Sequence, residues 1–156
     1  MNADSGLRIP GRALPASFSI CIPHSAFLPT HLPFVLLWIA LGGAAGTLAR
    51  YGVGLATDRL TATWPMGTLV VNVIGSFFLG LFTFWLRTPP FDPVLRAALT
   101  IGLCGGFTTF STFSYETVIL AEQGGLARSL TYVALSVGLS VLAMLAGVTA
   151  ARAISA

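Results

Sequence analysis

Four long apolar stretches follow one another along the 156-residue chain and dominate its pattern. They cover residues 34–57, 66–86, 94–120 and 129–151. The second stretch, of 21 residues, and the fourth, of 23, contain no charged residue. A helix needs about 20 predominantly apolar residues to cross the hydrocarbon core of a bilayer, so each stretch is long enough to span it. The pattern predicts an all-α membrane protein with four transmembrane helices.

The connections between these stretches are short and hold residues that end helices. They centre on Asp58-Arg59, Pro89-Pro90 and Gly124-Gly125. Proline and glycine are typical of such turns, and no connection is long enough for a separate soluble domain. We therefore expect one four-helix domain over residues 34–156.

Residues 1–33 differ from the rest, because five prolines interrupt every apolar run there. A secretory signal peptide is one interpretation, with Arg8 and Arg12 ahead of the apolar residues 13–22. The prolines break that apolar core and no small-x-small cleavage motif follows it, which argues against a signal peptide. We expect a disordered tail, or a start codon assigned too far upstream.

The composition excludes a soluble domain, because only 8% of the residues are charged and 55% are hydrophobic. Soluble domains contain about 25% charged residues, which help to cover a surface that faces water. The eight arginines are scattered singly, so the net charge of +3 does not indicate nucleic-acid binding. Cys21 and Cys104 lie 83 positions apart without a CxxC motif, so neither a disulfide framework nor a zinc site is predicted.

The arginines also bear on membrane orientation. Three fall on each side of the predicted membrane: Arg87, Arg96 and Arg152 on one, and Arg50, Arg59 and Arg128 on the other. The positive-inside rule therefore predicts almost no preference for either orientation in the membrane. Such a protein could insert both ways and pair antiparallel with itself. Alternatively, Arg50 lies too deep in its helix to influence membrane insertion, and the remaining arginines slightly favour one orientation.

Polar positions recur every four residues in two of the predicted spans. On the second span they are Thr68, Asn72, Ser76 and Gly80, and on the fourth they are Tyr132, Ser136 and Ser140. Small and hydroxyl residues commonly line packed helix faces, which explains Ser76 and Gly80 well. Asn72 fits packing less well, because its amide offers two donors at mid-membrane depth. Two stripes rich in donors favour a polar path between the helices.

The third span contains a run of residues with low helix propensity. Gly105 and Gly106 are adjacent, and a segment rich in Thr, Ser and Phe follows them. A break at the glycines would free backbone carbonyls and amides, which persist in a membrane only where they line a cavity or bind an ion. The alternative is a kink packed against a neighbouring helix. Phe110 and Phe113 could be core or lipid-facing residues, but the positive edge of an aromatic ring can also face an anion.

Arg50 and Glu116 are the charges that lie well inside the predicted helices. Long charged side chains usually extend towards the membrane interface. A pair of charges at the mouth of an ion path is the alternative. Gly42, Gly43 and Gly46 precede Arg50 and predict a close helix contact.

Three motifs together resemble one known family. They are GGxxGxxxRY at residues 42–51, PxGTxxxNxxGSF at residues 65–77 and GGxTTFSTFSxE at residues 105–116. The third is very specific, and the likeness to the Fluc/CrcB fluoride channels extends over about residues 34–153. Phe107 departs from the pattern, since the family often has an aliphatic residue there.

The resemblance implies an antiparallel, dual-topology homodimer in which the third helix of each subunit is broken and two fluoride pathways run in parallel. By position, the pathway residues are Thr68, Asn72, Phe110, Phe113, Tyr132, Ser136 and Ser140. Arg50 and Glu116 match charges of the vestibules. The carbonyls of Gly105 and Thr108 match those that hold a structural Na⁺ between the subunits. The cell inner membrane is the expected location.

A passive fluoride channel agrees with the chemistry of these side chains. Fluoride is small and tightly hydrated, and hydroxyl and amide donors replace its water without the tight trapping that a buried arginine would cause. Neither a nucleotide-binding loop nor a cluster of proton-relay carboxylates is present in the sequence. A small four-helix drug/proton antiporter is the alternative, but that class needs a carboxylate within its first helix. A non-transporting scaffold protein would need no aligned donors.

Overall fold

The protein is described by a computed structural model that covers residues 32–58, 64–87 and 92–155. Its helices are α1 (Leu32–Asp58), α2 (Met66–Trp85), α3 (Pro93–Ala97), the π-helical segment η3 (Ala98–Cys104), α4 (Gly105–Phe107), α5 (Phe110–Gly124) and α6 (Leu126–Ile154). Four stretches are long and apolar enough to cross a membrane: Leu32–Thr57, Met66–Trp85, Pro93–Gly124 and Leu126–Ile154. The predicted all-α architecture with four spanning helices is confirmed.

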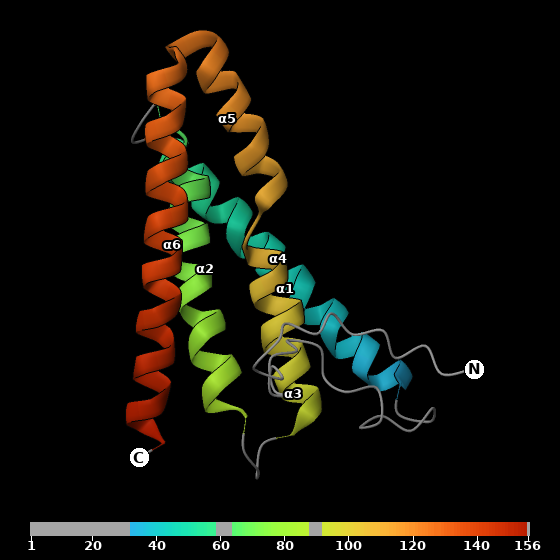
Figure 1. The fold of residues 1–156 in the computed structure, drawn as a ribbon. Coiled ribbons are helices and arrows are strands. Elements are labelled where there is room, and N and C mark those ends of the chain that lie inside the picture. The colour runs from blue at the N-terminus through green and yellow to red at the C-terminus, as the bar shows by residue number, and fades with distance from the viewer. Residues whose placement is uncertain (1–31, 59–63, 88–91, 156) are drawn as a thin grey trace, which may run out of the picture.

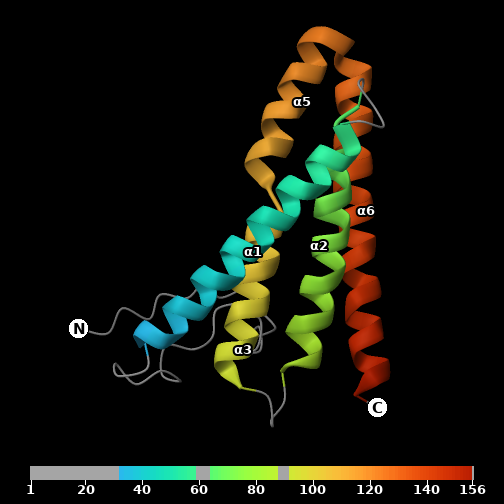
Figure 2. The same ribbon diagram turned by 180° about the vertical axis from the view of Figure 1, so that it is seen from behind.

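Successive spans alternate in direction (Figures 1 and 2). In Figure 1, α1 and the segment from α3 to α5 run upwards, and α2 and α6 run downwards. The α5–α6 turn is tight because Gly125 has a φ of 84°, a conformation that glycine adopts without the strain of a Cβ. Of the predicted tail, residues 32 and 33 form the start of α1, and the remainder lies outside the described residues.

The α2 and α6 helices lie side by side along most of their length (Figures 1 and 2), and glycines permit this contact. A Cβ at Gly80 would lie 2.9 Å from the sulfur of Met144. A Cβ at Gly147 would lie 2.9 Å from the backbone nitrogen of Leu81. Small residues let helix backbones approach closely in membranes, so the packing role expected of Gly80 is confirmed.

The α1 helix crosses the third span obliquely (Figure 1) and packs against η3 and α4. A Cβ at Gly42 would lie 3.1 Å from the backbone nitrogen of Leu103, and one at Gly46 would lie 2.8 Å from that of Phe107. The close contact predicted from the glycines of the first motif is confirmed. Cys104 is buried in this region as a free cysteine.

The third span is broken as predicted, but the break does not lie at the two glycines. Gly105 is helical, with φ −64° and ψ −38°, and α4 continues to Phe107. The chain then becomes extended at Thr108, with ψ 159°, and at Thr109, with φ −151° and ψ 124°. Gly106 is needed for contact rather than for a turn, since a Cβ there would lie 3.0 Å from the Cα of Gly43. The expectation of a break at Gly105-Gly106 was therefore wrong by two to three residues.

The buried core of the subunit is small. Phe113, Leu120 and Tyr132 form its cluster, with Trp64, Leu69 and Val133 packed around them. Many large apolar side chains point outwards instead, and Leu48, for example, is 70% exposed. Apolar surface of this kind is expected where a helix faces lipid or another membrane helix rather than water.

Candidate functional site

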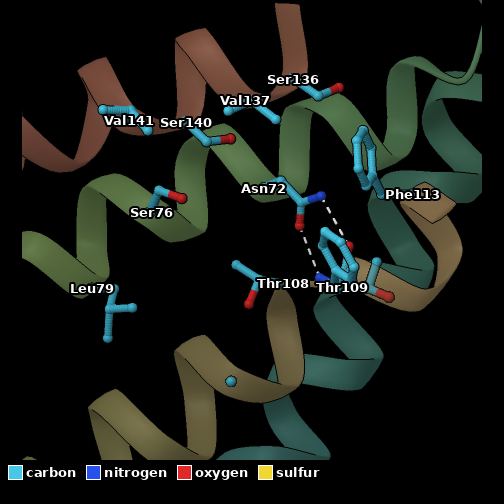
Figure 3. A pocket seen from close by; sticks show the side chains of 12 residues that line it. Asn72, Ser76, Leu79, Thr108, Thr109, Phe113, Ser136, Val137, Ser140 and Val141 are labelled. Atoms are coloured by element: carbon cyan, nitrogen blue, oxygen red, sulfur yellow. Dashed lines mark hydrogen bonds between the residues drawn. The ribbon is translucent and has the colours of Figure 1, made fainter. Parts of the chain in front are cut away.

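The break in the third span is held by the side chain of Asn72 on α2. The Asn72 Nδ2 donates a hydrogen bond to the carbonyl oxygen of Thr109 at 3.0 Å, and the Thr109 N–H donates to Asn72 Oδ1 at 2.8 Å (Figure 3). One amide side chain thus satisfies both backbone groups of an extended residue, as a neighbouring strand would. Thr109 is only 8% exposed, so without Asn72 these groups would lack partners.

Thr109 also starts the second half of the broken span. It is the N-cap of α5, and its Oγ1 accepts a hydrogen bond from the Thr112 N–H at 3.2 Å. Its hydroxyl lies 3.2 Å from the Ser111 hydroxyl and 3.1 Å from that of Thr112. Threonine is a favoured N-cap because its side chain satisfies an N–H that the helix cannot. The Thr-Thr pair therefore determines where the span breaks and where it resumes.

A cavity of about 470 Å³ opens beside this break, between α2, α6 and the two halves of the third span. Figure 3 shows the polar side chains that face it. Its lining is Asn72, Ser76, Leu79, Gly105, Thr108, Thr109, Phe110, Phe113, Ser136, Val137, Ser140 and Val141. We call this the central cavity. It brings together five of the seven residues predicted for the pathway.

Two buried hydroxyls on the α6 side of the central cavity have no hydrogen-bond partner among the described residues. They are the Oγ atoms of Ser136, which is 4% exposed and neighbours the Tyr132 hydroxyl, and of Ser140. Buried hydroxyls nearly always find a partner, so two unsatisfied ones on the wall of one cavity indicate a site for an acceptor. An amide NH₂ carries two hydrogens, and Asn72 uses one on Thr109. Its second hydrogen is a third candidate donor.

Phe110 and Phe113 stand together at this cavity but differ in environment. Their ring centroids are 5.5 Å apart, with an angle of 44° between the planes. Phe113 is 8% exposed and packs on Tyr132, with the ring centroids 5.4 Å apart. Phe110 is 78% exposed on the surface of the subunit. Phe113 is therefore a core residue as well as a lining residue, whereas Phe110 is free to meet a second molecule.

A second cavity of about 420 Å³ lies on the other side of Thr109. Its lining is Thr47, Arg50, Tyr51, Gly54, Pro65, Gly67, Thr68, Val71, Thr109, Thr112 and Glu116. We call this the outer cavity. Arg50 and Glu116, the two predicted vestibule charges, therefore share one cavity. Thr109 lines both cavities, so the Asn72–Thr109 pair stands at the boundary between them.

The carboxylate of Glu116 connects three elements at the outer cavity. Oε1 accepts a hydrogen bond from the Thr68 hydroxyl at 2.8 Å, and Oε2 accepts one from the Tyr132 hydroxyl at 2.7 Å. Thr68 and Tyr132 were grouped with Asn72 in the sequence, but the structure places both hydroxyls on Glu116. Tyr132 is 0% exposed and lines neither the central nor the outer cavity.

The CrcB-like protein, Camphor Resistance (CrcB) family matches residues 37–148. The chain belongs to the CrcB family. It is 48% identical over 120 residues to the fluoride-specific ion channel FluC of Allorhizobium ampelinum, which covers 75% of this chain and 95% of the relative. It is 45% identical over 122 residues to the FluC of Caulobacter sp. (strain K31), which covers 76% and 95%.

This CrcB chain offers backbone oxygens rather than side chains for a cation at the break. Among the described residues there is no group of three or more His, Cys, Asp or Glu side chains that could hold a metal. In a continuous helix the carbonyl of Gly105 would accept from the Thr109 N–H, which here donates to Asn72. The carbonyl of Thr108 would accept from the Thr112 N–H, which here donates to Thr109 Oγ1. The N–H groups that would bond both carbonyls in a continuous helix are therefore bonded elsewhere.

Sequence reasoning missed several residues of the site. Thr109 is the most important of them, because it bonds Asn72, caps α5 and lines both cavities. The sequence did contain a signal for this role. Threonine is a favoured N-cap residue, and its side chain can accept a hydrogen bond from the N–H three residues later, which here is that of Thr112. The apolar lining residues Leu79, Val137 and Val141 carry no signal that distinguishes them from lipid-facing residues.

Proposed function

We propose that this protein is a fluoride-specific ion channel that lets fluoride leave the cell passively across the inner membrane. The CrcB family membership and the name of the relatives support the substrate. The observation that carries the mechanism is the pair of buried, unbonded hydroxyls of Ser136 and Ser140 on the wall of the central cavity.

The central cavity suits a small, strongly hydrated anion. Fluoride is a hard hydrogen-bond acceptor, and the hydroxyls of Ser136 and Ser140, with the second N–H of Asn72, supply donors that replace part of its water. Phe110 and Phe113 would turn their positive ring edges to the ion. None of these groups carries a full charge, so the ion would be bound weakly enough to leave again.

The outer cavity would serve as the vestibule through which the ion enters or leaves. Arg50 supplies a positive charge there, and Glu116 keeps its carboxylate bonded to Thr68 and Tyr132. Ordering of the Glu116 carboxylate by two hydroxyls would limit its repulsion of an anion, because charge-assisted hydrogen bonds spread its charge. In this arrangement Thr68 and Tyr132 would affect the ion indirectly, by holding the carboxylate of Glu116.

The functional unit is proposed to be an antiparallel homodimer. Phe110 is 78% exposed beside the central cavity, and a second subunit would cover it and close the open side of that cavity. Nearly balanced arginines favour insertion in both orientations. A tag placed after Ala156 should then be accessible from both faces of the membrane. A tag accessible from one face alone would contradict the dual topology.

A structural Na⁺ between the subunits completes the proposal. The carbonyls of Gly105 and Thr108 would hold it, because the helical partners of both carbonyls are bonded elsewhere. Gly105 is exposed, so a second copy could bring its own pair of carbonyls to the same ion. The thermal stability of the purified protein should fall when Na⁺ is replaced by N-methylglucamine. Equal stability in both cations would argue against the site.

Efflux from liposomes tests the transport function directly. Vesicles loaded with potassium fluoride and treated with valinomycin should release fluoride when they contain the protein, without a proton gradient or a nucleotide. Chloride-loaded vesicles should release little. A drug/proton antiporter would instead need a pH gradient, and among the described residues the carboxylate of α1 falls at its last position, Asp58. Absence of fluoride release, or equal release of chloride, would reject the proposal.

A further inference from the structure

Two arginines from different helices share one aromatic ring at the end of the molecule opposite the α5–α6 turn. The Cζ of Arg87 lies 6.0 Å from the centroid of the Phe84 ring, and the Cζ of Arg152 lies 5.7 Å from the same centroid. Arg87 follows the end of α2, and Arg152 is in the last turn of α6. These two helix ends lie side by side (Figures 1 and 2). We call this group the arginine pair.

No carboxylate of the described residues neutralises the arginine pair. Both side chains are exposed, and neither forms an ion pair with a carboxylate within the three described ranges. Asp92 lies at the same end of the protein, but its carboxylate accepts a hydrogen bond from the Val94 N–H. Two positive charges beside one ring attract an anion to this end of the protein.

The depth of the arginine pair identifies the anion that it would meet. The α2 span, Met66–Trp85, contains no charge, so Arg87 is the first charged residue beyond the hydrocarbon core. Arg152 is likewise the first charge after the uncharged residues 129–151 of α6. Both guanidinium groups therefore lie at headgroup level, where the phosphodiester of a phospholipid is the abundant anion.

The contact with Phe84 leaves the guanidinium groups able to bind a phosphate. Each guanidinium carries five N–H donors, and a cation–π contact does not use them in hydrogen bonds. Those donors match two phosphate oxygens in a bidentate arrangement. Attraction to the C-terminal carbonyls of α2 and α6 is the simpler explanation. However, within the described structure no hydrogen bond joins either arginine to such a carbonyl.

We propose that Arg87, Arg152 and Phe84 form a binding site for the headgroup phosphate of an anionic phospholipid. The site takes the lipid from the membrane surface at the ends of α2 and α6. Lipids with a net negative headgroup are preferred over zwitterionic ones, because a choline would bring a positive charge to the arginine pair.

Lipid enrichment measured in nanodiscs tests this site. The full-length protein is placed in nanodiscs of equal parts phosphatidylglycerol and phosphatidylcholine, extracted gently, and the lipid that stays bound is quantified by mass spectrometry. The wild-type protein should retain phosphatidylglycerol severalfold over phosphatidylcholine. The single variants Arg87→Gln and Arg152→Gln should lower that ratio, and the double variant should bring it close to one. Inorganic phosphate added at millimolar concentration should not displace the lipid.

Arg128 provides the matched control. Its Cζ lies 5.7 Å from the centroid of the Trp64 ring at the other end of the molecule. Arg128→Gln removes the same charge and a similar contact, so it should leave the lipid ratio unchanged. An equal loss in Arg128→Gln, or full enrichment in the double variant, would overturn the proposal. If the double variant does not fold, Phe84→Leu keeps both charges and should still lower the ratio, and an unchanged ratio there would also reject it.

Discussion

The hydrogen bonds between Asn72 and Thr109 predict a large effect from one substitution. In Asn72→Ala the Thr109 N–H loses its 2.8 Å acceptor and the Thr109 carbonyl loses its 3.0 Å donor. Because Thr109 is only 8% exposed, water does not readily replace either partner. A buried backbone group left without a partner costs about 1–3 kcal/mol. We therefore expect a loss of roughly 2–6 kcal/mol in the free energy of unfolding, since two such groups are affected.

Ser76→Ala is the matched control for this substitution. Ser76 lies one turn further along α2 and lines the same cavity, but it makes no hydrogen bond with Thr109 (Figure 3). Its truncation should change the free energy of unfolding by less than about 1 kcal/mol, as is usual away from buried networks. Comparing the two variants distinguishes the effect of losing the hydrogen bonds at the break from the effect of losing a side chain that lines the cavity.

The assay combines thermal stability in detergent with fluoride efflux from liposomes. Asn72→Ala should lose stability and efflux together, whereas Ser76→Ala should keep its stability. Hydrogen exchange adds a local measurement, because the Thr109 amide should be protected in the wild-type protein and exchange much faster in Asn72→Ala. If Asn72→Ala were as stable as Ser76→Ala and its Thr109 amide stayed protected, the break would be held by something other than Asn72.

Three further predictions concern packing, the central cavity and Glu116. Gly147→Ala should destabilise the protein by about 1–3 kcal/mol through overpacking against α2, whereas Gly138→Ala in the same helix has free space and should be neutral or stabilising in a thermal melt. Ser136→Ala combined with Ser140→Ala should lower fluoride efflux several-fold with stability preserved or raised, because it removes two unbonded buried hydroxyls; unchanged efflux would exclude them as ion ligands. Glu116→Ala should cost about 1–3 kcal/mol for each of the two buried hydroxyls, of Thr68 and Tyr132, that lose their acceptor. The Gln variant should cost less, since its amide oxygen still accepts from one of them.

The architecture was predictable because hydrophobic length is a direct physical requirement of a membrane span. Residues 66–86 were expected to form the second helix, and α2 covers Met66–Trp85. The glycine contacts were predictable for a similar reason, since Gly42 and Gly46 are spaced to face one neighbouring helix. Local composition is enough for both inferences, because each depends on the segment itself and not on which distant residue meets it.

The position of the break was harder to predict because helix propensity is a weak guide in a packed membrane protein. Gly105 and Gly106 are the poorest helix formers of their segment, yet they remain helical. A Cβ at Gly106 would collide with the backbone of α1, so the glycine serves the contact with that helix. The break lies instead at Thr108 and Thr109. There the hydroxyl of Thr109 and the side-chain amide of Asn72 on α2 replace the missing helical hydrogen bonds. The tertiary partner Asn72, 37 positions away, stabilises that position together with the N-cap at Thr109.

The polar side chains predicted for the pathway fall into two groups, because some have a hydrogen-bond partner and others do not. Thr68 lies one turn before Asn72 on α2, so sequence spacing alone puts their side chains on one path. Glu116 on α5 takes the Thr68 hydroxyl at 2.8 Å and the Tyr132 hydroxyl at 2.7 Å, and both donors are thereby occupied. Ser136 and Ser140 have no hydrogen-bond partner within the described part of the chain. An ion in the central cavity would therefore meet Ser136 and Ser140, whereas the hydroxyls of Thr68 and Tyr132 stay bonded to Glu116.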